Sequence, residues 1–190
     1  MKSAKMSKSL GNTLSPLSIV KEFGADTARF FIMHAANPER EMEWSDAGCS
    51  SDHKLLLKLW TLVNKPLNKV RENEDVYDKY IRFRLNRMIR DVTENYEEKL
   101  IRDSLNEIVG FMDLIRKYKK MKPNKQLFHD CIEKIILVLS PVVPHISEEL
   151  WEILGHQEFI SLAQWPKYDK NYINKKIEEH WRSFDFLVED

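Results

Sequence analysis

The sequence has few residues that interrupt helices and no run of apolar residues that approaches a membrane span. Only five Gly and seven Pro occur among 190 residues, and the apolar spacing is helical nearly throughout. The opening Met1-Lys2-Ser3-Ala4 has no apolar stretch behind it that could serve as a secretory signal. We therefore expect a protein of the cytoplasm that does not enter a membrane.

The sequence also has only two cysteines and no net charge. Cys49 and Cys131 lie far apart, and neither has a partner His or Cys at metal-ligand spacing. We expect two reduced, small apolar residues and no metal site, although the sequence alone leaves a disulfide open. Thirty Lys and Arg balance thirty Asp and Glu. Any surface for nucleic acid must then come from segregated charge, because the net field does not attract phosphate.

The apolar periodicity predicts an all-α fold in which four long stripes form an antiparallel helix bundle. Capping signals place a short helix from Ser15-Pro16 to Gly24 and a second one from about Asp26. The remaining predictions are helices after Ser45, at about Val76 to Glu97, Arg102 to Met121, Gln126 to Leu139 and Pro144 to Leu154, an extended Phe159 to Trp165, and an exposed amphipathic end at Ile173 to Val188.

The stretch with the most evident chemistry is Lys5-Met6-Ser7-Lys8-Ser9, with Gly11 close behind. Two ammonium groups and two hydroxyls within five residues can wrap a triphosphate, the lysines acting as point charges. The stretch lacks the glycines of a P-loop. By composition alone, a solvated Lys/Ser-rich tail remains the alternative.

Four segments resemble class I aminoacyl-tRNA synthetases of the leucine type. Lys5 to Ser9 matches every letter of the KMSKS signature, and Gly24 to Phe31 is similar to the GAD-T-x-R segment that follows it. Glu43 to Gly48 resembles the passage into the helical domain of the leucine type. Ser140 to Trp151 is similar to the Pro-His-x-x-Glu-Glu-Leu-Trp element that ends the bundle. The segments follow the family's order and spacing, and the isoleucine and valine types are the nearest alternatives.

The resemblance implies three parts. Residues 1–44 would be the KMSKS loop and stem-contact region, residues 45–166 a helical bundle of the anticodon-binding type, and residues 167–190 an extension toward a further domain. The nucleotide-binding domain, its His-Ile-Gly-His signature and the editing insertion would all precede Met1. We therefore expect this chain by itself to bind no ATP and to have no aminoacylation activity.

The resemblance also implies site residues and ligands. Lys5 and Lys8 would be catalytic, stabilising charge on the departing pyrophosphate while leucine is activated to leucyl-adenylate. Met6, Ser7, Lys8 and Ser9 would contact ATP, which enters with Mg²⁺ as a substrate of the full-length enzyme. The implied partners are tRNA(Leu), and ATP and leucine through the absent catalytic domain. We expect a monomer.

A tRNA surface on the bundle is predicted from clustered cations. Its candidate residues are Lys117, Lys119, Lys120, Lys122 and Lys125 around Tyr118, together with Arg84 and Arg87 on the preceding helix. The lysines would neutralise phosphates and Tyr118 would stack on a base. Alternatively, the lysines only offset a helix dipole and keep the surface solvated. Asp91 and Glu94 interrupt the arginine face.

Other features have plainer interpretations. We interpret His145 as a packing or capping residue, and Trp60 and Trp151 as core aromatics. The departures at Asn86 and at Ile101-Arg102-Asp103 from common leucine-type patterns weaken residue-level claims about tRNA contacts. A free-standing RNA-binding or scaffold module is the second functional hypothesis, and a purely structural bundle the third.

Overall fold

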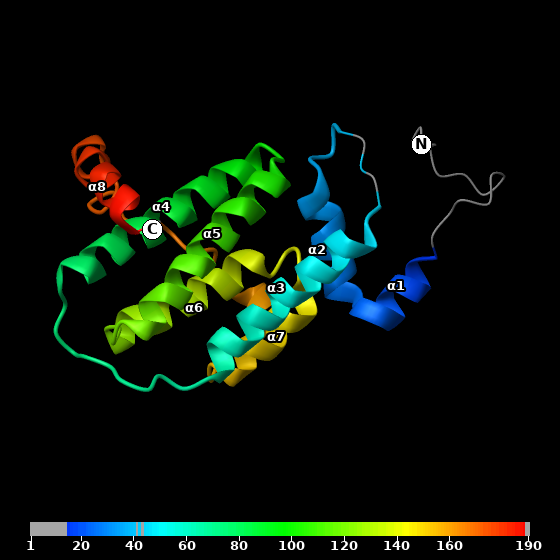
Figure 1. The fold of residues 1–190 in the computed structure, drawn as a ribbon, viewed down its shortest axis with the longest axis horizontal. Coiled ribbons are helices and arrows are strands. Elements are labelled where there is room, and N and C mark those ends of the chain that lie inside the picture. Colours follow the sequence, from blue (N-terminus) through cyan, green and yellow to red (C-terminus); the bar gives the residue numbers. More distant parts are fainter. Residues whose placement is uncertain (1–14, 41, 43, 189–190) are drawn as a thin grey trace.

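The computed structural model describes residues 15–40, 42 and 44–188, and for residues 182–188 it describes the backbone alone. This part of the chain is helical and has no β-strand (Figure 1). Its elements are α1 (Pro16–Phe23), α2 (Ala25–Ala35), α3 (Asp46–Asn64), α4 (Val76–Glu97), α5 (Ile101–Lys120), α6 (Lys125–Leu139), α7 (Pro144–Ile153), the 3-10 turn η2 (Ile160–Leu162) and α8 (Lys175–Val188). The predicted all-α fold is confirmed.

Local capping signals set most of the helix ends. Pro16 occupies the first turn of α1, and Gly24 ends that helix at φ 85°, a conformation that favours glycine. Asp75 and Asp78 form a capping box at the start of α4, where each carboxylate accepts the other residue's backbone N–H at 2.9 Å. The predicted ends of α4, α5, α6 and α7 lie within one residue of the observed ones.

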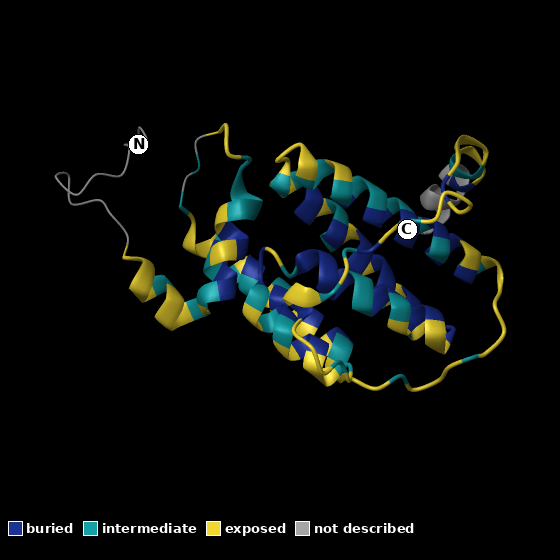
Figure 2. Ribbon diagram, turned by 180° about the vertical axis from the view of Figure 1, so that it is seen from behind, coloured by how far each residue is buried: buried dark blue, intermediate teal, exposed yellow. Residues whose placement is uncertain are grey.

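The core lies between α4, α5 and α6, and α3 and α7 cover it (Figures 1 and 2). The inner faces of these helices are buried while their outer faces are exposed, as amphipathic stripes require (Figure 2). Each large apolar side chain buried there contributes about 1.5–3 kcal/mol relative to exposure. The largest fully buried side chains include Tyr80, Ile81 and Phe83 of α4, Leu105, Ile108, Phe111, Met112 and Ile115 of α5, and Leu127 of α6.

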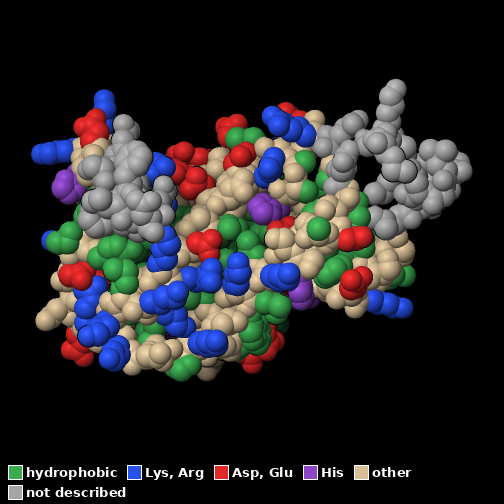
Figure 3. Space-filling model, in the orientation of Figure 1, with side chains coloured by type: hydrophobic (Ala, Val, Ile, Leu, Met, Phe, Trp, Pro, Cys, Tyr) green, Lys and Arg blue, Asp and Glu red, His purple; other side chains and the backbone are tan. Residues whose placement is uncertain are grey.

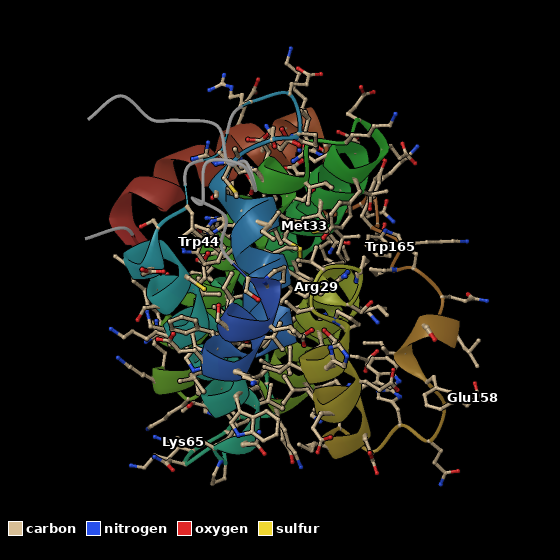
Figure 4. All side chains as sticks on the ribbon, turned by 90° about the vertical axis from the view of Figure 1, so that its right-hand side faces the viewer. Arg29, Met33, Trp44, Lys65, Glu158 and Trp165 are labelled. Atoms are coloured by element: carbon tan, nitrogen blue, oxygen red, sulfur yellow. The ribbon has the colours of Figure 1, made fainter. Side chains whose placement is uncertain are left out.

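Helix α2 is fastened to the beginning of α7 by polar contacts. Arg29 donates from Nε to Val142 O at 2.9 Å and from Nη2 to Pro141 O at 3.0 Å (Figure 4 labels Arg29). Asp26 Oδ2 accepts the backbone N–H of Ile146 at 2.6 Å. The Asp26 carboxylate, expected at the start of its own helix, therefore also satisfies the first turn of α7.

A close approach joins α2 to α3. A Cβ on Gly48 would lie 2.7 Å from the ring of Phe31, so only glycine allows these two helices to come this near. The Phe31 ring in turn meets the indole of Trp44 edge-on, with centroids 4.9 Å apart. Helix α2 is thus packed directly onto α3.

Three expectations are wrong. The stretch Phe159 to Trp165 is not extended throughout, because Ile160–Leu162 form the 3-10 turn η2 between the extended Phe159 and Ala163. Ile160 is buried there, and its N–H donates to Glu148 Oε1 at 3.1 Å. Trp60 is not a core aromatic, since it is 36% exposed. The end of the chain is not simply exposed, because Ile173 and Trp181 are buried.

Trp181 explains why the last helix is held against the bundle. Its indole lies 5.5 Å from the ring of Tyr80 and 6.5 Å from that of Phe83, measured between centroids, so α8 covers part of α4. Arg90 adds an ion pair to Glu178 at 2.6 Å. The sequence does not reveal these partners because they lie about 90 to 100 residues apart along the chain.

The described thiols and acidic groups form no metal site. Cys49 and Cys131 are both buried and free, and burial raises the pKa of each thiol. No group of three or more His, Cys, Asp or Glu side chains in the described residues could hold a metal ion. Within the same part of the chain, no helix is long and apolar enough to span a membrane.

The pair His34 and Asp52 predicts a pH dependence of stability. His34 Nδ1 lies 3.0 Å from Asp52 Oδ1, and Nε2 lies 3.2 Å from Asn106 Oδ1, so both ring nitrogens face oxygen acceptors. The hydrogen bond to Asp52 raises the His34 pKa above 6.5, although burial opposes the shift. The charged imidazole therefore stabilises the fold below pH 6.5, and this contribution disappears as pH rises through the raised pKa.

Urea unfolding of the native chain and of the His34→Gln variant, measured from about pH 6 to about pH 9, tests this dependence. The difference in free energy of unfolding between the two proteins should shrink as pH rises. A difference that stays constant across this range would contradict the assignment of the charge to His34.

Candidate nucleic-acid interface

The predicted ATP-contacting loop, with Lys5, Met6, Ser7, Lys8 and Ser9, lies outside the described residues. Its roles therefore stay predictions. The predicted RNA-binding residues of the bundle are among the described residues, so their positions on the surface are known.

A strongly basic groove of about 1020 Å³ runs between the second half of α3, the linker from α3 to α4, and the end of α5. Lys and Arg side chains gather over these elements in the space-filling view (Figure 3). We call this feature the basic groove. Among the residues that the structure describes, eight cations and no acidic residue line it; the described lining is Lys54, Leu57, Lys58, Thr61, Leu62, Lys65, Pro66, Asn68, Lys69, Arg116, Lys119, Lys120 and Lys122.

Half of these cations come from α3 and the linker that follows it, where no RNA contact was predicted. Lys54, Lys58 and Lys65 lie on one face of α3 and at its end, and Lys69 follows in the linker. All four are exposed. The spacing of the α3 lysines at i, i+4 and i+11 was a usable signal, because these positions share a helix face. It was hidden by the apolar stripe of the same helix.

Lys119 lines the groove, but its ammonium group is bound to the backbone of α3. Its ammonium group donates to Leu62 O at 2.8 Å and to Lys65 O, two carbonyls at the end of α3. It also stands 5.6 Å from the centre of the Phe128 ring. Burial, with a smaller contribution from the positive Lys65, lowers the Lys119 pKa. Lys119 thus joins α5 to α3, and the flanking Lys120 and Lys122 face the groove as exposed cations.

Arg71 fixes the linker that forms one wall of the groove. Its guanidinium group binds Asp78 Oδ1 at 2.8 Å and Asp75 Oδ2 at 2.7 Å, and its Nε donates to Lys122 O at 2.8 Å. Backbone bonds pair Arg71 with the residues on either side of Asn124 in a short parallel bridge. The linker is therefore held to the turn between α5 and α6.

The prediction that Tyr118 stacks on a base needs correction. Tyr118 is fully buried, and its hydroxyl donates to Asp78 Oδ1 and accepts the N–H of Asn124 at 2.9 Å. Burial, followed by the bond to Asp78, raises the pKa of Tyr118. The ring lies on the apolar stripe of α5, whereas the nearby Lys117 and Lys120 are exposed. Its role is to connect the buried Asp78 to the turn.

The other predicted RNA contacts lie outside the groove. Arg84 donates to Tyr80 Oη at 2.7 Å and lies over that ring, and Arg87 lies 3.4 Å from Asp91 Oδ2. Lys117 and Lys125 are exposed but are not among the lining residues. Of the predicted set, the structure therefore places Lys119, Lys120 and Lys122 in the basic groove, together with lysines of α3 and the linker. Arg84 and Arg87 are not among the residues that line it.

His145 does not pack in the core. Its side chain is 74% exposed, and Nδ1 lies 2.8 Å from Asp26 Oδ1. Because a carboxylate only accepts, Nδ1 carries the proton. Trp151, by contrast, is buried as expected and stacks on His156 with ring centroids 3.5 Å apart.

Comparison with known families defines the class of protein. The family model described as the anticodon-binding domain of tRNA ligase matches residues 78–189, more than half of the chain, and the chain belongs to this family. A second model, described as tRNA synthetases class I (I, L, M and V), matches residues 1–45.

The individual relatives are leucine–tRNA ligases. The chain is 35% identical over 180 residues to the enzyme of Thermotoga petrophila and 34% identical over 175 residues to that of Fervidobacterium nodosum. It is 32% identical over 180 residues to that of Geotalea daltonii. Each alignment covers 87% of this chain but only 21–22% of the relative, so the chain spans about a fifth of their length.

The fold also resembles a solved synthetase. The ternary complex of LeuRS, tRNA and LeuAMS from Agrobacterium radiobacter superposes with a TM-score of 0.80 at 25% sequence identity. The match covers 90% of this chain and 23% of that chain.

Proposed function

We propose that this chain supplies the ATP-handling loop and the tRNA-docking bundle of a leucine–tRNA ligase. The complete enzyme would activate leucine with ATP to leucyl-adenylate and transfer the leucyl group to tRNA(Leu). The similarity to leucine–tRNA ligases supports the amino acid, and the order of the family segments supports the parts. Residues 1–44 would end the catalytic domain, 45–166 would form the bundle, and 167–190 would lead to a further domain.

The observation that carries the RNA-docking part is the basic groove. In the described part of the chain, eight cations and no carboxylate line one hollow of about 1020 Å³, although the whole sequence has no net charge. Such segregation concentrates positive potential where a phosphate backbone can release its counterions. Lys54, Lys58, Lys65 and Lys69 would contact one side of the backbone, and Lys120 and Lys122 the other.

The catalytic part rests on the KMSKS loop. Lys8 would stabilise the charge that grows on pyrophosphate as it leaves, and Lys5 would assist it. Met6, Ser7 and Ser9 would position the loop on ATP, which carries Mg²⁺. We expect the 190 residues alone to show no aminoacylation, and we place the working enzyme in the cytoplasm as a monomer.

Binding of tRNA(Leu) transcript to the 190-residue chain tests the docking proposal. The logarithm of the association constant should fall linearly with the logarithm of the salt concentration. In Lys58→Ala/Lys69→Ala the slope should decrease by about one per lysine, and affinity at about 0.1 M salt should fall at least about tenfold. The matched control is Lys167→Ala/Lys170→Ala, which removes two exposed charges away from the groove. Equal losses in both double variants would refute the groove as the binding surface.

A further inference from the structure

A second hollow adjoins the basic groove and differs from it in chemistry. It has a volume of about 350 Å³ and lies between the turn from α1 to α2, one face of α3, and the start of α7. Its walls include Phe23, His53, Leu57, Trp60 and His145. We call it the aromatic pocket. Lys and Arg are absent from its described lining, whereas they dominate the basic groove.

The walls of the aromatic pocket are held in place by contacts among themselves. His53 Nδ1 lies 3.1 Å from Thr27 Oγ1, and the His53 ring meets that of Phe23 edge-on with centroids 6.0 Å apart. His145 is oriented by Asp26, whose other oxygen binds the backbone of α7. Both imidazoles use Nδ1 for these bonds, so Nε2 is the nitrogen that can face a ligand.

Trp60 gives the pocket an accessible aromatic surface. It is 36% exposed, whereas Trp151 and Trp181 are 6% and 8% exposed. An indole left partly open to solvent beside other aromatic rings can accept a flat, uncharged ring by stacking. Every nucleobase has such a face, and stacking on aromatic side chains tolerates any base.

Leu57 connects the two hollows. It lines both of them and is 51% exposed, so it forms the ridge between them. Around α3, Lys54 and Lys58 lie on the groove side of this ridge, and His53 and Trp60 lie on the pocket side. A nucleotide whose phosphate lies in the groove can therefore extend its base over the ridge.

We propose that the aromatic pocket receives one unstacked nucleobase of the RNA whose backbone lies in the basic groove. This inference rests on the proposed function. The charge distribution supports the occupant. Phosphates meet the cations of the groove, and the neutral base meets a pocket whose described lining includes the carboxylate of Asp26, which would repel phosphate. The ring of Trp60 stacks on the base, and the imidazoles of His53 and His145 bind its polar edge.

Three RNA hairpins with the same stem test the proposal on the 190-residue chain: one fully paired, one with a single bulged nucleotide, and one with an abasic bulge. The abasic hairpin has the same backbone bend without the base. The native chain should bind the base-containing bulge about tenfold more tightly than the abasic one. Trp60→Ala should abolish this preference, and Trp60→Phe should retain most of it. Phe159→Ala, which removes an exposed aromatic ring outside the pocket, should leave it unchanged.

The outcomes separate the pocket from the groove. If base-containing and abasic bulges bind equally while the paired hairpin still binds with the expected salt dependence, the pocket is refuted and the docking proposal stands. If no hairpin binds, both proposals fail. If Trp60→Ala weakens all three hairpins equally, Trp60 serves the fold and the pocket proposal is also refuted. Melting of each variant by circular dichroism identifies this last case.

Discussion

Replacing Asp78 by alanine should lower the free energy of unfolding by about 3 to 5 kcal/mol. Asp78 is fully buried, and its carboxylate binds Arg71, the hydroxyl of Tyr118 and the backbone N–H of Asp75. Removing it deprives these donors of their shared acceptor and leaves the fully buried Tyr118 hydroxyl without one. Urea denaturation followed by far-UV circular dichroism measures the loss.

Two milder variants calibrate this expectation. Tyr118→Phe removes only the hydroxyl that connects Asp78 to Asn124, and it should cost about 1 to 3 kcal/mol. Asp75→Ala removes a cap whose side chain is 54% exposed, and it should cost about 1 kcal/mol. If Asp78→Ala is no more harmful than Asp75→Ala, the buried network does not hold the linker as we describe.

Replacing Lys8 by alanine should have the largest effect on chemistry, a loss of about two to three orders of magnitude in leucine-dependent ATP–pyrophosphate exchange. The measurement requires an active enzyme in which this chain is joined to the nucleotide-binding part of a relative. A preplaced cation that binds the leaving pyrophosphate lowers the transition state by on the order of 3 kcal/mol, so adenylate formation should suffer. Affinity for tRNA should hardly change, because the described lining of the basic groove comes from α3, the linker and the end of α5.

Lys2→Ala provides the matched control, since Lys2 lies just outside the KMSKS pentapeptide. Exchange that survives Lys8→Ala undiminished would remove the catalytic role. If the joined enzyme has no exchange activity even with the native loop, but the chain still binds tRNA, the free-standing RNA-binding module becomes the better hypothesis.

Helix positions were predictable from the sequence because their signals are local. Asp75 and Asp78 cap α4 within one turn, Pro16 and Gly24 bound α1, and an apolar residue every third or fourth position marks each inner face. The family segments also depend on short runs of residues. For these reasons the sequence alone was enough to predict the all-α fold and the family relationship correctly.

The candidate interface was only half predictable. Lys120 and Lys122 were identified from their clustering, but the same clustering included the buried Tyr118 and the structurally engaged Lys119. Adjacent residues on a helix point in different directions, so closeness in sequence does not mean a shared surface. The aromatic pocket was missed because Trp60 was interpreted as part of the core.

The sequence by itself determined the helices, their ends and the family of this protein, because each depends on residues a few positions apart. Only the tertiary structure decided that α3 and the end of α5 face each other across one basic groove, that Trp181 covers α4, and that Trp60 remains open. Amphipathic periodicity tells which face of a helix is buried but not against which partner. Packing of segments far apart in the sequence makes that choice.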